Sequence, residues 1–312
     1  MIPKMSDHGH EGHVHGPSRE GDQRRLMLAL LVAIVAMLAE AAGGWLSNSL
    51  ALLSDAGHML ADAGAIGLSL FALRIGARPA DSKRTYGYYR LEILAALVNG
   101  GLLLAIAAGI AVEGYQRLLH PQPVQVQTVV LLACFGIALN AAGMWITHGG
   151  EHASMNLRST FLHLGGDLLN SVGVLFSAVI IHYTGQLAAD PIISFLIAGT
   201  IVWSAIRLCR EAVDVLLEGA PGHIPVADVS GELARVQGVT AVHDLHVWTI
   251  TSGMVALSAH IVVTCEGPNC RSHDEILTDA KAVLREKFHI EHTTIQFESQ
   301  SYRHDGHEEV VH

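Results

Sequence analysis

The chain has 312 residues, of which 50% are hydrophobic and only 15% are charged. Soluble globular proteins carry about 25% charged residues, so this composition indicates a protein that crosses a membrane several times. The formal net charge of −10 excludes a protein that binds nucleic acid through a basic surface. The mean hydropathy of +0.37 excludes a disordered chain, which needs low hydrophobicity.

The negative charge is concentrated near the C-terminus. Residues 1–25 have a net charge of 0, residues 26–214 of −2 and residues 215–312 of −8. The acidic excess therefore belongs to a polar C-terminal part of the chain. The composition predicts four parts: a His-rich tail over 1–24, a membrane domain over 25–214, a soluble domain over 215–300 and a His-containing tail over 301–312.

Six apolar runs are long enough for membrane-spanning helices, which need about 20 residues. They cover residues 26–47, 51–74, 91–117, 126–147, 157–183 and 191–213. The first run continues past a stretch that resembles a cleavage site, which favours a helix over a cleaved signal peptide. Basic residues gather at one set of connections, with Arg117 as the exception near an opposite one. Because basic residues mark the cytoplasmic side, both termini are expected in the cytoplasm.

Two of these runs contain a His and an Asp four positions apart, His58 with Asp62 and His163 with Asp167. Side chains four positions apart project from one face of a helix. Two facing pairs offer two nitrogens and two oxygens, a ligand set that suits tetrahedral Zn²⁺. A hydrogen-bonded pair explains a single copy equally well, but two copies on separate helices favour a metal site.

Other polar residues in the apolar runs have a structural alternative. Asp55 shares the face of His58, and we expect it either to orient the His58 ring or to be solvated near the start of its helix. Five further residues suit hydrogen bonds between helices as well as transport: Glu40, Asn99, Glu113, Asn140 and Asn170. Four glycines are expected to allow close helix approach: Gly43, Gly44, Gly165 and Gly166.

Beyond Pro221 the pattern changes to short soluble elements. The expected elements are a helix over 225–236, strands over 241–251 and 254–264 around a Ser252-Gly253 turn, a helix over 273–288 and a strand over 293–298. The order αββαβ predicts a small α/β domain with both helices on one face of an open sheet. The expected fold class is thus an all-α six-helix membrane domain followed by a small α/β domain.

A second candidate metal site lies in this soluble domain, with ordinary solvated histidines as the alternative. Its candidates are His243, His246, His260, His273 and Glu298. Alternation along a strand would place His243 and His246 on opposite faces, so we do not expect both to serve one site. The tails offer further histidines for loose metal capture: His8, His10, His13 and His15 at the N-terminus, and His304, His307 and His312 at the C-terminus.

These motifs resemble those of the cation diffusion facilitators, in their bacterial zinc, cobalt and cadmium resistance branch. The resemblance covers nearly the whole chain, and it is carried by LSNSLALLSDAGHMLAD, KRTYGYYRLEILAALVN, NLRSTFLHLGGDLLNSVGV, ADPIIS and HDLHVWTIT. It implies a homodimer in the bacterial inner membrane, with a cytoplasmic metallochaperone-like domain. It also implies proton-coupled export of divalent metal, hence a transporter and not an enzyme.

The resemblance carries the transport site onto His58, Asp62, His163 and Asp167. A His–Asp pair on both helices is similar to zinc-transporting members, and Cd²⁺ and Co²⁺ remain acceptable cargo. Zn²⁺ is therefore expected both as the substrate and as a regulatory ligand of the soluble domain. There, members differ in using the equivalent of His243 or of His246, and Gln296 stands where one type has a histidine.

The loop between the second and third runs departs from the family pattern. Some members bind a metal there through an Asp and two histidines, but this chain has Arg84 and Tyr88 after Asp81. We therefore expect that loop site to be missing. Two other function classes remain open: an intramembrane metalloenzyme, although no His-Glu-x-x-His motif occurs, and a membrane metal sensor that binds metal without moving it.

Overall fold

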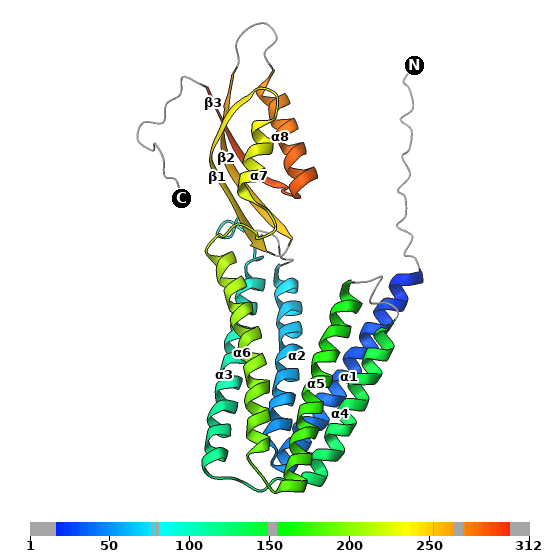
Figure 1. Ribbon diagram of the computed structural model, residues 1–312. Coiled ribbons are helices and arrows are strands. Elements are labelled where there is room, and N and C mark those ends of the chain that lie inside the picture. The colour runs from blue at the N-terminus through cyan, green and yellow to red at the C-terminus, as the bar shows by residue number, and fades with distance from the viewer. Residues whose placement is uncertain are drawn as a thin grey trace. The chain divides into compact units, whose positions relative to one another are not determined.

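The computed structural model describes residues 17–76, 78, 81–148, 155–251, 253–264 and 271–299. Six long helices come first in these residues, and shorter helices and strands follow (Figure 1). The long helices are α1 (Pro17–Ser47), α2 (Leu50–Gly76), α3 (Leu91–Leu119), α4 (Val126–Thr147), α5 (Met155–Thr184) and α6 (Ala189–Leu216). Each of the six predicted apolar runs therefore forms a helix.

The described residues of five helices are long and apolar enough to cross a membrane: α1 from Arg24, α3, α4, α5 from Leu157, and α6. The sixth, α2, is continuous over 27 residues and carries one of the His–Asp pairs. The helical membrane domain predicted from the composition is confirmed. Polar side chains in such helices are costly unless they face protein or have a partner, which makes their contacts informative.

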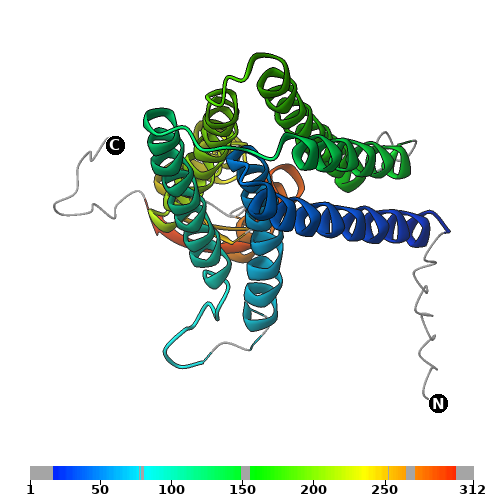
Figure 2. The same cartoon turned by 90° about the horizontal axis from the view of Figure 1, so that it is seen from below.

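The chain divides into two compact units, residues 1–64 with 102–203 and residues 65–101 with 204–312. In the first unit α1, α4 and α5 pack against one another (Figure 2, blue and green). A Cβ atom on Gly43 would overlap the end of the Leu132 side chain of α4, so the glycine lets the two helices approach with Leu132 in its present position. A Cβ atom on Gly44 would overlap the Leu53 backbone nitrogen, and one on Gly165 would lie 3.7 Å from Met144 of α4. Gly166 has no neighbour within 4 Å, so the expectation of close approach is wrong for Gly166.

The connection between α1 and α2 is held by an arginine from α3. Arg117 donates from Nη1 to the carbonyl oxygen of Asn48 at 2.6 Å and from Nη2 to Asn48 Oδ1 at 3.0 Å. Its Nε donates to Glu113 Oε1, one turn earlier, at 2.9 Å. Arg117 is the basic residue that lies near a connection on the side with few basic residues. Its structural role explains this position, because its charge is paired with Glu113 and its other donors hold the α1–α2 connection.

The first turn of α2 is capped by a carboxylate from α6. Asp190 accepts hydrogen bonds from Ser49 Oγ at 2.5 Å, from the Leu50 amide at 2.7 Å and from the Ala51 amide at 3.4 Å. Asp190 and Ser49 are both buried. The first amides of a helix have no partner within the helix. The Ser49 hydroxyl accepts from the Leu52 amide at 3.3 Å as a local cap, and Asp190 supplements it from a distant part of the chain.

The soluble part of the second unit has the predicted order αββαβ. Its elements are α7 (Val226–Ala234), β1 (Val239–Thr251), β2 (Met254–Val263), α8 (His273–Phe288) and β3 (His292–Ser299). The strands form one sheet in the order β1-β2-β3, with β1 and β2 antiparallel and β2 and β3 parallel. Ser272 and Glu275 form a capping box that begins α8, which explains why its predicted start is correct.

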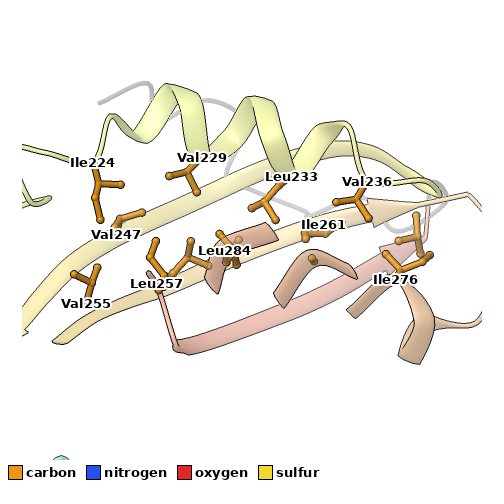
Figure 3. Close-up of a cluster of buried hydrophobic side chains, with 14 residues drawn as sticks. Ile224, Val229, Leu233, Val236, Val247, Val255, Leu257, Ile261, Ile276 and Leu284 are labelled. Atoms are coloured by element: carbon orange, nitrogen blue, oxygen red, sulfur yellow. The ribbon is translucent and has the colours of Figure 1, made fainter. Parts of the chain in front are cut away.

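Both short helices cover the same face of this sheet (Figure 1). Their apolar side chains, such as Leu233 of α7 and Leu284 of α8, meet Leu257 and Ile261 of β2 (Figure 3). Burial of each large aliphatic side chain contributes about 1.5–3 kcal/mol. Side chains alternate along β2, so His260 lies on the opposite face of the sheet, away from this core.

Candidate metal centre

The two predicted His–Asp pairs come together in the first unit. His58 Nε2 lies 3.6 Å from Asp62 Oδ2 and 3.8 Å from Asp167 Oδ1. His163 Nε2 lies 3.5 Å from the same Asp62 oxygen and 3.7 Å from Asp167 Oδ2. Imidazole and carboxylate groups therefore alternate around a ring, two side chains from α2 and two from α5, and Asp167 uses a different oxygen for each histidine. We call these four residues the His–Asp ring.

The spacing of the ring fits a metal ion after a small contraction. Zinc–nitrogen and zinc–oxygen bonds of 2.0–2.2 Å require ligand atoms about 3.3 Å apart in a tetrahedron, and the four neighbouring distances are 3.5–3.8 Å. Groups on opposite sides of the ring are farther apart, because no three of its ligand atoms all lie within 4.8 Å of one another. Among the described residues, only a group in the soluble domain meets that criterion. The His–Asp ring is therefore slightly open.

The environment of the ring also suits a cation. Asp167 has a side chain only 2% exposed, and neither of its carboxylate oxygens has a hydrogen-bond donor in the described part of the chain. Asp62 Oδ2 is likewise buried without a donor. Buried carboxylates need a positive partner. The His163 side chain is 46% exposed, so the ring is accessible on that side.

Asp55 does not orient His58, which contradicts one expectation from the sequence. The His58 Nδ1 atom is buried with no hydrogen-bond partner, whereas Asp55 Oδ2 lies 3.4 Å from Ser171 Oγ of α5. Asp55 is itself fully buried, so it is not solvated either. Residues three apart on a helix share only part of a face, and here Asp55 turns toward a neighbouring helix.

The soluble domain brings together three of its five predicted candidates. Glu298 of β3 lies between two histidines: its Oε2 is 3.1 Å from His243 Nε2 of β1, and its Oε1 is 2.9 Å from His260 Nδ1 of β2. The rings of His243 and His260 are 5.3 Å apart. One ligand group from each strand is thus presented on the open face of the sheet, and we call these three residues the sheet site.

A β-bulge overturns the expectation for His243 and His246. His243 pairs with His260 and His246 pairs with Ser258, so between these pairs two residues of β1 lie opposite one residue of β2. Directly paired residues share a face, and His243 and His246 therefore lie on the same face. The extra residue is accommodated at Asp244, which has a left-handed φ of 49°.

Asp244 is a neighbour of the sheet site that the sequence did not predict. Its Oδ1 lies 3.0 Å from His246 Nε2 and its Oδ2 lies 3.6 Å from His260 Nε2. A signal was present, because Asp is rare in strands and, unlike most residues, tolerates the left-handed region. His273 is elsewhere: it begins α8, and its ring stacks on Phe297, a residue packed against the core.

The electrostatics of the sheet site keep its carboxylates ionised. Burial acts to raise the pKa of Glu298, but hydrogen bonds from Gln296 and His243, with the nearby histidine charges, lower this pKa below its ordinary value. The hydrogen bond with His246 lowers the pKa of Asp244. An ionised carboxylate beside two imidazoles is a suitable partner for a divalent metal.

The remaining candidates lie outside both sites. The tail histidines His8, His10, His13, His15, His304, His307 and His312 fall outside the described residues. In the loop after α2, Asp81 accepts hydrogen bonds from the amides of Lys83 and Arg84 and from the Tyr88 hydroxyl. These donors, the Lys83 amide foremost, lower the pKa of the exposed Asp81 carboxyl. Its carboxylate therefore stabilises the loop.

Known proteins resemble the chain along its length. The family profile described as the cation efflux transmembrane domain matches residues 26–217, and that of the cation efflux protein cytoplasmic domain matches residues 221–300. The metal cation efflux system protein CzcD of Cupriavidus metallidurans is 40% identical over 92% of this chain and 90% of its own. A cadmium, cobalt and zinc/H(+)-K(+) antiporter of Bacillus velezensis is 35% identical over 95% of this chain and 94% of its own.

A solved structure, the metal-bound C-terminal domain of CzcD from Cupriavidus metallidurans, is 37% identical to this chain. The match covers 24% of this chain and 99% of the solved domain, with a TM-score of 0.22. The membrane profile alone spans more than half of the chain, and it includes all four residues of the His–Asp ring. The chain therefore belongs to the cation diffusion facilitator family of cation efflux proteins, as its motifs indicated.

Proposed function

We propose that this protein exports divalent metal cations from the cytoplasm, with Zn²⁺ as its preferred cargo. The observation that carries this proposal is the His–Asp ring, in which imidazole and carboxylate groups alternate at 3.5–3.8 Å. Two nitrogens and two oxygens suit Zn²⁺, and Co²⁺ and Cd²⁺ are further candidates. The names of both relatives support metal efflux as the activity.

We further propose that export is an exchange for monovalent cations. Metal binding requires neutral imidazoles and ionised carboxylates, so protons compete with the metal for the ring. The ring would face each side of the membrane in turn, and protonation of His58 or His163 would favour release. The relative named as an H(+)-K(+) antiporter supports protons and K⁺ as the exchanged ions.

The first prediction concerns flux through the ring. Asp62→Ala or His163→Ala removes one ligand of four, and Zn²⁺ uptake into liposomes that contain the purified protein should fall to the rate of protein-free liposomes. His182→Ala, an exposed histidine on the same helix as His163, is the matched control and should transport normally. A fluorescent zinc indicator inside the liposomes gives the rate.

The same assay separates the alternatives. Wild-type flux in both ring variants would contradict the assignment of the transport site, and flux that is independent of the pH gradient would contradict proton exchange. A membrane metal sensor would bind Zn²⁺ and lose binding in the ring variants, but it would move no metal. A metalloenzyme would likewise give no flux.

We also propose that the soluble domain binds regulatory Zn²⁺ at the sheet site and that the protein acts as a homodimer in the inner membrane. The convergence of His243, His260 and Glu298 supports the metal site. The distribution of basic residues supports cytoplasmic termini. Accessibility of single cysteines to an impermeant reagent in intact cells tests this orientation, because the exposed residues of the α3–α4 connection, such as Pro121 and Gln122, should react and residues of α8 should not.

A further inference from the structure

Four polar side chains from four helices meet in the interior of the first unit, apart from the His–Asp ring. They are Glu40 of α1, Asp55 of α2, Asn140 of α4 and Ser171 of α5, each at most 1% exposed. Ser171 Oγ lies 3.4 Å from Asp55 Oδ2 and 3.5 Å from Asn140 Nδ2. We call these residues the oxygen cluster, because its acceptors are carboxylate, amide and hydroxyl oxygens.

A glycine of α4 makes room for this cluster. A Cβ atom on Gly136 would overlap Glu40 Oε1 and would lie 3.2 Å from Ser171 Oγ. Both oxygens are therefore close to one point on the α4 backbone, and a side chain at residue 136 would force the Glu40 carboxylate to shift. The glycine at residue 136 therefore leaves space for the buried Glu40 carboxylate beside α4.

The cluster has more acceptors than the protein supplies with donors. With both carboxylates ionised, the Glu40 oxygens, Asp55 Oδ1 and Asn140 Oδ1 have no donor at hydrogen-bond geometry in the described residues. The Asn170 side chain is a further neighbour of Asp55, and a proton on either carboxyl group would join Glu40 to Asp55. Within the same residues, no Lys, Arg or His nitrogen lies within 4.0 Å of either carboxylate. Buried ionised groups require compensation. One shared proton joins only two of these oxygens, whereas a hard metal cation takes several oxygen ligands at once.

We propose that the oxygen cluster is a second cation site, which binds an alkali cation, K⁺ or Na⁺, in exchange for the divalent cargo. Its donors are all oxygen, which suits hard cations and not the softer metals that select imidazole or thiolate. Mg²⁺ would demand octahedral geometry with several waters, for which a fully buried cluster of four helices is unsuited.

The position of the cluster explains how such a cation would affect transport, provided that the cargo binds the His–Asp ring as proposed above. Asp55 lies three residues before His58, and Ser171 lies four residues after Asp167. The two sites are therefore about one turn, or about 5.4 Å, apart along both α2 and α5. Two cations at this separation repel each other in the protein interior, so occupancy of the cluster weakens cargo binding.

The test measures Zn²⁺ affinity of the full-length protein in detergent by calorimetry, at fixed pH and ionic strength. Choline chloride is replaced stepwise by KCl or NaCl, and in separate titrations by MgCl₂ or CaCl₂. The wild type should bind Zn²⁺ several-fold more weakly in K⁺ or Na⁺ than in choline. Glu40→Gln, Asp55→Asn and Gly136→Ala should each lose this dependence, and the milder Ser171→Ala should reduce it.

Glu113→Gln, a carboxylate of α3 outside the cluster, is the matched control and should keep the wild-type dependence. An affinity that is the same in K⁺, Na⁺ and choline would overturn the proposal, as would a response to pH alone or to Mg²⁺ and Ca²⁺ alone. His163→Ala separates the two proposals, because it should remove one Zn²⁺ equivalent. If it does not, the proposed transport site fails independently of the alkali response.

Discussion

Glu298 contacts two histidines at once, one with each carboxylate oxygen, and each of these three residues comes from a different strand. Such a site depends on strand register, because a shift of one residue would move the side chain to the opposite face. The bulge at Asp244 corrects the register of β1 next to His243. The positions of the three ligand groups in the sheet site therefore depend on the strand register and the bulge as well as on the residue types.

The second prediction concerns Glu298→Gln. The amide keeps the shape of the side chain but removes the negative charge and one of the two acceptor oxygens, so the sheet site should lose Zn²⁺ affinity. Loss of a group beside a metal ligand weakens binding roughly 10–100-fold, and loss of a ligand should weaken it at least as much. Calorimetric titration of the full-length protein should then count one fewer tight Zn²⁺ equivalent per chain.

Glu291→Gln is the control for this variant, because Glu291 is an exposed acid that pairs with Arg285 outside the sheet site. An unchanged number of tight zinc equivalents in Glu298→Gln would contradict the assignment of the site.

At the residue scale, the sequence predicted the ring far better than the sheet site. The ring residues lie on regular helices, where a spacing of four positions fixes the face. The sheet site depends on an irregular strand, and period-two counting fails at Asp244 because a bulge adds a residue. The role expected for Asp55 was wrong for a related reason, since its contact with Ser171 of α5 is not contained in the spacing of α2 alone.

At the scale of helices and strands, sequence patterns predicted most boundaries closely. The predicted helices 126–147 and 273–288 agree with α4 and α8. Local signals were available for α8, whose capping box is visible as Ser272 followed by Glu275. The start of α2 has no such complete local signal, because its main cap is Asp190, 140 residues away in the chain.

The third prediction concerns this long-range cap. Asp190→Ala should leave the Ser49 hydroxyl and the Leu50 amide without their partner in a buried place, which should lower the free energy of unfolding by about 1–3 kcal/mol. Thermal unfolding in detergent, followed by helical circular dichroism, measures the change. Asp214→Ala on the exposed side of the same helix is the control, and equal destabilisation by both variants would argue against the cap.

The fourth prediction concerns the ion pairs of Glu232. Its carboxylate pairs with Lys287 of α8 at 2.5 Å and with Arg235 at 2.6 Å. The hydrogen bond from Lys287, followed by the two positive charges, lowers the pKa of Glu232 below its ordinary 4.5. The stabilisation is therefore complete above pH 4.5 and is lost as the pH falls through the lower pKa of the folded state.

Glu232→Gln removes these ion pairs, so at pH 7 the amides of α7 and α8 should exchange with solvent faster than in the wild type. The increase should be small because the paired groups are near the surface. The difference from the wild type should disappear once the pH lies well below 4.5. Hydrogen exchange of α7 and α8 amides at several pH values measures this, with the exposed Glu286→Gln as the control. A difference that persists in acid would show that packing, and not charge, is responsible.

At the scale of the whole molecule, the net charge of −8 over residues 215–312 has a consequence for assembly. Two copies of this segment in the proposed homodimer would repel each other at low salt, and the range of that repulsion is about 8 Å at physiological ionic strength. Divalent cations bound at the sheet sites would offset it. The four-part division of the chain remains a prediction, and this charge distribution is its main support.

The fifth prediction is that Zn²⁺ brings the two soluble domains together. Spin labels on a cysteine introduced at the exposed Arg285, in a background without the native cysteines, should report a shorter inter-subunit distance with saturating Zn²⁺. The shift should shrink at high salt, where the repulsion is already screened. It should also be reduced by Glu298→Gln, and a distance that does not change with zinc would contradict the prediction.

The short connection around Asn48 ties several helices at one point. Arg117 of α3 and Asp190 of α6 both bind it, and the amide of Gln125, just before α4, donates to Ser47 O. In an alternating-access cycle, the tied ends of these helices would act as a pivot, since moving them apart would break buried polar bonds. The opposite ends of these helices would then carry the larger displacement. Under the proposed function, exchange of cargo would demand a wide swing on that side of the membrane and only a narrow one beside the pivot.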